Sequence, residues 1–239
     1  MRASVFAAMA ASAALTACAT SSEPGVRLHP QSRERLGTAH RIGVVQPKVM
    51  MFELGAGGIR QPKDEWSATA RANVSAAVVN SLRGVGYDAR LLEPSPDLKD
   101  DLDQVRLLYE AVAPSIVYAT YSQKFPGKLE KFEYSLGDVS GLLDRLGVDV
   151  LAIPYGSDEI SSGGRKATQA VGAVAAILLG VGAVGRSGVT VLNLAIVDRS
   201  GAVVWFNLRG AGGSYDLRKP DSAQEMVERL VQDLPGAHK

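Results

Sequence analysis

Cys18 is the only cysteine in this chain of 239 residues, so no disulfide within the chain can hold its fold together. The cysteine follows a short N-terminal segment in which Arg2 precedes a mostly apolar, alanine-rich run from Val5 to Leu15. A positive start, an apolar core of this length and an exit through small residues are typical of a secretory signal peptide. We therefore expect residues 1–17 to be removed and the mature chain to fold by burial alone.

The residues Leu15, Thr16, Ala17 and Cys18 resemble the signal of bacterial lipoproteins, in which the cysteine is acylated. Acylation would explain an unpaired thiol in an oxidising compartment. More than one acyl chain, palmitate among them, makes membrane anchoring stable. By the same resemblance, Ala19 after the cysteine favours the outer membrane over the inner one. We predict a lipid anchor on Cys18 and a protein that faces the periplasm; a cleaved signal with a chance cysteine is the alternative.

The charge of the mature chain is balanced. Removing Arg2 from the 26 basic residues leaves 25, which equals the 25 acidic residues. A protein with no basic excess is poorly suited to holding phosphate backbones, so we exclude nucleic acid as a partner. Residues 18–39 are polar and irregular and are predicted to be a flexible tether that carries the lipidated cysteine. Residues 40–236 have the length of a single periplasmic domain.

Strands and amphipathic helices alternate along this domain. Their order predicts an α/β fold with a single mixed sheet of about five strands, helices packed on it, and an apolar helical insertion. The segment 49–54 either extends the first strand or pairs back on it. The expected strands are 41–47, 87–92, 148–154, 189–197 and 202–208, and the expected helices are 64–83, 97–112, 135–146 and 221–234.

Three local patterns support a resemblance to a known group of domains. They are the opening strand Ile42–Val45, the helix end, glycine and strand of Leu146–Ile153, and the hairpin Val197–Trp205, in which Asp198 and Gly201 bracket the turn. Together they resemble the amino-terminal domain of TolB and related periplasmic lipoprotein domains such as CsgG. The resemblance covers roughly residues 40–235. It implies this fold and a role in binding partners or in envelope assembly, without shared catalytic residues.

An apolar insertion at residues 165–188 departs from that pattern. Residues 170–185 contain no polar side chain, and as a helix they would be about 24 Å long, short of the roughly 30 Å of a bilayer core. Gly172, Ala176 and Gly180 recur at the spacing that lets helices approach closely, and with Ile177 they form a candidate association element. Burial against the domain's own sheet, contact with another subunit, and contact with lipid remain open; the glycine pattern 180–185 lacks the preceding strand of a nucleotide site.

The chain offers few residues for catalysis. Its histidines, His29, His40 and His238, lie near the ends of the chain, and the single cysteine is assigned to the lipid. This argues against histidine-based triads and His/Cys metal sites, so we expect no cofactor and no metal. Asp158 and Glu159 are adjacent and would point apart in a strand, and we expect exposed loop carboxylates rather than an acid–base pair.

These observations favour a non-enzymatic lipoprotein of the outer membrane that binds a partner or serves envelope assembly, through an envelope protein or through self-association. The alternative is a subunit of an oligomeric secretion or pore complex that uses residues 165–188 to contact lipid or its neighbours. The third hypothesis is an unrecognised envelope enzyme.

Overall fold

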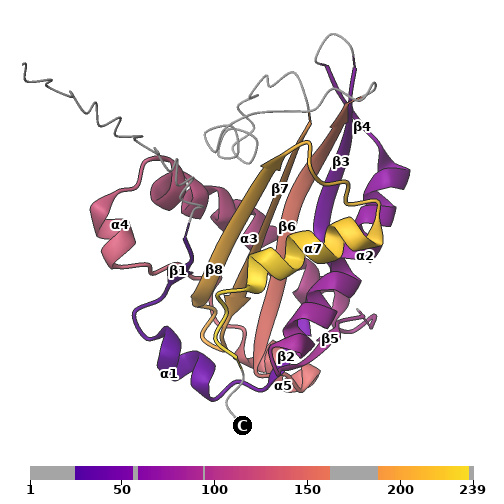
Figure 1. Ribbon diagram of the computed structural model, residues 1–239. Helices are drawn as coiled ribbons and strands as arrows, with labels where there is room; N and C mark the ends of the chain where they lie inside the picture. The colour runs from indigo at the N-terminus through magenta and orange to yellow at the C-terminus, as the bar shows by residue number, and fades with distance from the viewer. Residues whose placement is uncertain (1–24, 56–58, 94, 162–187, 237–239) are drawn as a thin grey trace, which may run out of the picture.

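The computed structural model describes residues 25–55, 59–93, 95–161 and 188–236 (Figure 1). The predicted signal peptide, Cys18 and residues 162–187 lie outside the described part. The predictions of a lipid anchor and of an association element at Gly172, Ala176, Ile177 and Gly180 therefore remain predictions.

The centre of the domain is a mixed sheet of eight strands, which corrects the expected number of about five. The path through the sheet is β1-β8-β7-β6-β2-β5, with β3 beside β6 and β4 beside β3. The pairs β2–β5, β2–β6 and β3–β6 are parallel, and the remaining pairs are antiparallel. The strands are β1 (Arg27–Leu28), β2 (Arg41–Val44), β3 (Lys48–Leu54), β4 (Arg60–Pro62), β5 (Asp88–Leu91), β6 (Val150–Ser161), β7 (Val189–Val197) and β8 (Val203–Gly212).

The additional strands arise mainly because β6 is longer than its sequence pattern indicated. Its first half pairs with β2, where Ile42 lies opposite Val150, and its second half pairs with β3, where Lys48 lies opposite Tyr155. The pairing along this side of β6 is interrupted at Gln46 and Pro47, between β2 and β3, because proline has no N–H to donate to a β-ladder. The segment 49–54 thus continues the line of the first strand as β3, and β4 folds back on it.

Helices cover both faces of the sheet (Figure 1). Helices α2 and α7 pack on one face around a core that includes Val74, Leu82 and Leu230. Helices α3 and α5 pack on the other face around a core that includes Tyr109, Leu143 and Phe206. The helices are α1 (Ser32–Gly37), α2 (Asp64–Gly84), α3 (Lys99–Val117), the π-helix η1 (Tyr118–Ser122), α4 (Pro126–Glu130), α5 (Ser140–Leu146) and α7 (Pro220–Val231).

Three further segments differ from expectation. Of the helix expected at 135–146, only Ser140–Leu146 is helical, as α5. Residues 25–39, which we expected in the tether, belong to the packed domain: β1 pairs with β8, and Leu36 and Ala39 are buried. The helix expected at 97–112 does not end there: α3 continues through Pro114 to Val117 and then into η1.

The hairpin β7–β8 and the amphipathic helix expected at 64–83 are confirmed. Trp205 is a core residue, whereas Trp66 is only partly buried and lies beneath the guanidinium of Arg218, 4.1 Å from its ring centre. In the part of the chain that the structure describes, no helix is long and apolar enough to cross a bilayer.

Candidate binding groove

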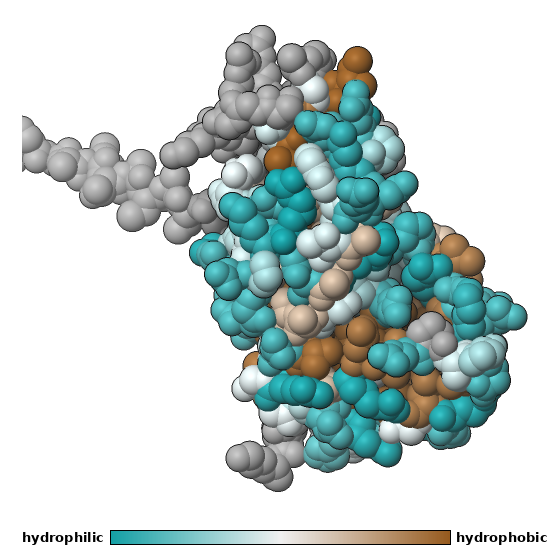
Figure 2. Space-filling model, turned by 90° about the vertical axis from the view of Figure 1, so that its right-hand side faces the viewer, coloured by the Kyte–Doolittle hydropathy of each residue, from teal (hydrophilic) through white to brown (hydrophobic). Residues whose placement is uncertain are grey.

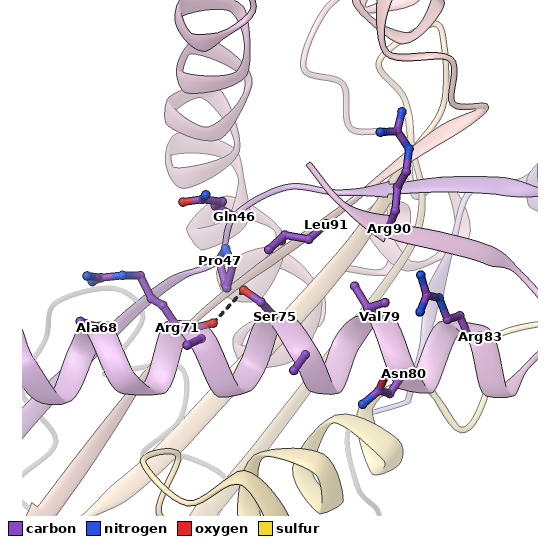
Figure 3. A pocket seen from close by; sticks show the side chains of 12 residues that line it. Gln46, Pro47, Ala68, Arg71, Ser75, Val79, Asn80, Arg83, Arg90 and Leu91 are labelled. Carbon is purple, nitrogen blue, oxygen red and sulfur yellow. Dashed lines mark hydrogen bonds between the residues drawn. The ribbon is translucent and has the colours of Figure 1, made fainter. Parts of the chain in front are cut away.

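A groove of about 620 Å³ runs along the outer side of α2 where the helix passes the edge strand β5 (Figure 3). Its floor contains Pro47, at the break between β2 and β3, together with Leu91 at the end of β5. Its helical wall is a row of small and apolar side chains. Figure 2 faces this edge of the molecule and shows apolar side chains exposed between hydrophilic ones. The helical wall comprises Ala68, Ala72, Ser75, Ala76 and Val79.

The two sides of α2 explain why the wall is shallow. The inner side carries the larger residues Val74, Val78 and Leu82, which are buried against the sheet. The outer side carries Ala68, Ala72 and Ala76 one helical turn apart, and all three are exposed. Because alanine is small and loses no side-chain entropy on burial, this row leaves room for another chain to approach the helix closely.

Three arginines surround the groove: Arg71, Arg83 and Arg90. Most arginines of the described chain pair with a carboxylate, such as Arg35 with Asp198 at 2.5 Å. Among the described residues, none of the three groove arginines has a carboxylate within ion-pair distance. The groove therefore presents positive charge that the domain itself does not neutralise, although the chain as a whole is close to neutral.

Backbone carbonyls hold two of these guanidinium groups in place. The Nε of Arg83 donates to the carbonyl of Ala89 at 2.8 Å, and the Nη2 of Arg90 donates to the carbonyl of Leu146. Each guanidinium carries five N–H donors, so most of its donors remain available. The bond to Ala89 also occupies an outward-facing carbonyl of β5, which is an edge strand.

The sequence did not predict this groove, because hydrophobic periodicity identifies the buried side of α2 and the groove residues lie on its exposed side. The available signal was the row Ala68, Ala72 and Ala76 beside arginines that have no acidic residue four positions away on the same helix. Such a row is chemically compatible with an anionic ligand that also has small apolar groups, because guanidinium groups bind carboxylates through paired hydrogen bonds.

The adjacent carboxylates Asp158 and Glu159 point apart, as expected for a strand, but they are buried in β6 and not exposed in a loop. Asp158 accepts hydrogen bonds from the hydroxyl of Thr190 at 2.7 Å and the backbone N–H of Leu217 at 2.9 Å. Glu159 forms an ion pair with Arg60 at 2.7 Å. Their partners lie on different elements, so the two carboxylates do not converge on a common ligand.

Burial raises the pKa of Asp158 to about 6 and also raises the pKa of Glu159. Both groups anchor neighbouring segments: Asp158 holds the loop before α7 on the sheet, and Glu159 holds β4. In the described ranges of the chain, no three His, Cys, Asp or Glu side chains gather where they could hold a metal ion.

Comparison with known proteins gives distant structural neighbours. No protein-family model matches the chain, and no curated protein sequence matches it. The PelC dodecamer from Paraburkholderia phytofirmans is 12% identical, with a TM-score of 0.38 over 90% of this chain and 97% of that one. The lipoprotein GNA1162 from Neisseria meningitidis is 13% identical, with a TM-score of 0.32 over 82% of this chain and 97% of that one.

The C-terminal domain of LpoB from Salmonella enterica is 12% identical, with a TM-score of 0.25 over 77% of this chain and 95% of that one. None of these three structures is a TolB or CsgG domain, so the finer resemblance to those proteins stays a prediction. The scores are too low to carry a functional argument.

Proposed function

We propose that this chain is an outer-membrane lipoprotein, anchored through Cys18, whose periplasmic domain binds an acidic, extended segment of an envelope protein without catalysing a reaction. The observation that carries the proposal is the set of three arginines around an apolar groove, none of which has a carboxylate partner in the described domain. The lipoprotein-like signal at Leu15–Cys18 supports the location.

The dimensions of the groove suit a short extended segment. Arg71 and Arg83 lie twelve residues apart on α2, which corresponds to about 18 Å along the helix axis. An extended chain covers that distance with about five or six residues. The segment would lie between a helix and an edge strand, an arrangement that proteins use to bind extended peptides.

A peptide-binding measurement tests the proposal directly. The probe is a fluorescein-labelled peptide in which alanine and aspartate alternate, and the control peptide alternates alanine and lysine. We expect the acidic peptide alone to raise the fluorescence anisotropy, with an affinity that falls as salt is added, because exposed ion pairs are screened.

The matched variants are Arg71→Glu and Arg33→Glu. Both arginines are exposed and, within the described residues, form no ion pair, but only Arg71 lies at the groove. Arg71→Glu should abolish binding and Arg33→Glu should preserve it, with equal melting temperatures. Equal binding of both peptides, or equal effects of both substitutions, would refute the proposed site.

A second measurement identifies the natural partner. A photo-crosslinking residue at Ala72, in the wall of the groove, should capture an envelope protein in intact cells, and mass spectrometry should place the crosslink in an acidic segment. The same crosslink in the Arg71→Glu background should be lost. A crosslink that persists there would mean that the captured protein binds elsewhere.

A further inference from the structure

The first described residues of the chain are fastened to η1. The carbonyl of Gly25 accepts hydrogen bonds from the hydroxyl of Tyr121 at 3.1 Å and from the guanidinium of Arg27 at 2.9 Å. Arg27 also donates to the carbonyl of Thr120 at 2.8 Å, and its guanidinium lies 4.2 Å from the centre of the Tyr121 ring. The position at which the chain enters the domain is therefore fixed.

The distance between this point and the predicted anchor is limited. Seven peptide links separate Cys18 from Gly25, and a fully extended chain of that length spans at most about 25 Å. If Cys18 is acylated, η1 cannot move farther than this from the lipid to which Cys18 is attached. The elements next to η1 are then confined to within about that distance of the membrane.

Those elements expose an unusual number of large apolar side chains. Tyr118 is 44% exposed, Phe125 is 45% exposed and Leu129 is 41% exposed. The rings of Tyr118 and Phe125 pack edge to face with centroids 6.1 Å apart, and the N–H of Phe125 donates to the carbonyl of Ala119 at 2.9 Å. The aromatic pair is thus held in place at the surface and not buried.

Basic residues accompany these apolar ones along the chain. Lys124, Lys128 and Lys131 are exposed and outnumber the exposed Glu130 and Glu133 of the same segment. In the described part of the protein none of the three lysines forms an ion pair, and Lys128 lies 5.2 Å from the centre of the Tyr134 ring. We name these three lysines together with Tyr118, Phe125 and Leu129 the η1–α4 surface. Aromatic and aliphatic groups among lysines are typical of segments that lie at the interface of an anionic membrane.

The apolar character continues along α3. Leu107 is 58% exposed, and it lies on the same side of the helix as Ala111 and Tyr118, four and eleven residues later. Exposed apolar residues gain significance when they join a larger patch at a partner or membrane contact. Leu107 and Tyr118 thus extend the exposed apolar side chains of the η1–α4 surface along α3.

We infer that the η1–α4 surface rests on a phospholipid membrane, with Phe125 and Leu129 among the headgroups and the lysines on lipid phosphates. The inference goes beyond partner binding at the groove and rests on the proposed acylation of Cys18 for its geometry. The apolar and basic residues of the surface do not depend on the anchor, so binding to anionic lipid can be tested with and without acylation of Cys18.

The test uses an environment-sensitive NBD label on the full mature chain. Ser122→Cys places the label at the end of η1, and Thr69→Cys places it on α2, which packs on the opposite face of the sheet. Both are exposed hydroxyl residues, so the substitutions are matched. In the acylated chain Cys18 has no free thiol, and in the soluble form Cys18→Ser removes it.

With vesicles of phosphatidylethanolamine and phosphatidylglycerol, we expect the label at position 122 to brighten and shift to the blue, and the label at 69 to stay unchanged. Phe125→Ser with Leu129→Ser should weaken partitioning of the soluble form about tenfold. Each Lys→Gln substitution should weaken it about fivefold and reduce its salt dependence.

Other outcomes overturn the inference. If neither label responds, or both respond equally, in acylated and soluble forms alike, the surface does not rest on lipid. If the chain forms a dimer that Phe125→Ser with Leu129→Ser dissociates, and vesicles do not compete with it, the surface is a contact between copies. Mass spectrometry of residue 18 reports acylation separately, so an absent anchor is distinguishable from an inactive surface.

Discussion

The buried carboxylate of Asp158 provides the sharpest test of the energetics of this fold. The side chain is completely inaccessible to solvent, and within the described chain it has no cation as a direct partner. Its hydrogen bonds from Thr190 and Leu217 do not offset the loss of hydration, so burial raises its pKa to about 6. The ordinary value is 3.8.

The sign of the effect on stability follows from the proton balance. Between about pH 4 and pH 6 the folded protein holds a proton on Asp158 that the unfolded chain has released. The free energy of unfolding therefore decreases as the pH rises through this window. Above pH 6 the contribution of Asp158 no longer changes with pH. A difference of about two pKa units corresponds to about 3 kcal/mol at neutral pH.

Asp158→Asn removes the charge and retains the shape. The amide oxygen can accept from the N–H of Leu217, and the amide nitrogen can donate to the hydroxyl of Thr190. We expect the variant to be more stable than the natural protein by about 2–3 kcal/mol at pH 7.5 and equal to it near pH 4. Asp88→Asn, at an exposed position of β5, is the control and should change stability by only a few tenths of a kcal/mol.

Urea denaturation at several pH values between 4 and 7.5, followed by tryptophan fluorescence, measures these differences. Comparing each variant with the natural protein at the same pH removes the contributions of other titrating groups. If Asp158→Asn is destabilised at pH 7.5 and shows the same pH dependence as the natural protein, the carboxylate is charged in the fold and its hydrogen bonds outweigh the cost of burial.

Three further predictions concern other parts of the chain. Cys18→Ser should release the protein from membranes or leave its signal uncut, and unchanged processing together with sedimentation with the outer membrane would contradict the lipid anchor. Trp205→Ala should cost about 3–5 kcal/mol, because the indole is fully buried; an unchanged melting temperature would place it outside the core. Replacing residues 165–187 with a short Gly/Ser linker should leave a folded, more soluble monomer, since β6 and β7 pair from Leu151 opposite Val197 to Asp158 opposite Thr190. Failure to fold would assign the segment to the core.

The elements that could be predicted are those whose signal is local. The buried stripe of α2, the stripe of α7 with Met226 and Leu230, and the hairpin turn at Asp198–Gly201 depend on spacing within a few residues. Gly201 illustrates this: its φ of 78° requires a residue that tolerates the left-handed region, and a glycine at the end of a turn signals it.

The features that could not be predicted depend on residues far apart in the chain. A proline inside a helix usually kinks or ends it. Here α3 continues through Pro114 because Tyr109 and Ala113 before it and Ile116 after it are packed in the core. Asp158 lies in a strand and not in a loop because β6 pairs there with β3 on one side and β7 on the other, opposite Met51 and Thr190. The groove exists because the edge strand β5 lies beside α2. The sequence of neither segment alone predicts that they are neighbours.

The order of strands places the two proposed surfaces at opposite ends of the sheet. The chain enters at β1, which forms one edge, and the groove lies beside β5, which forms the other. Five strand-to-strand steps separate them, or about 24 Å. A domain held to the membrane near β1 would therefore present its arginines away from the lipid. Because an anionic membrane also attracts arginines, this separation leaves the groove free for a protein partner.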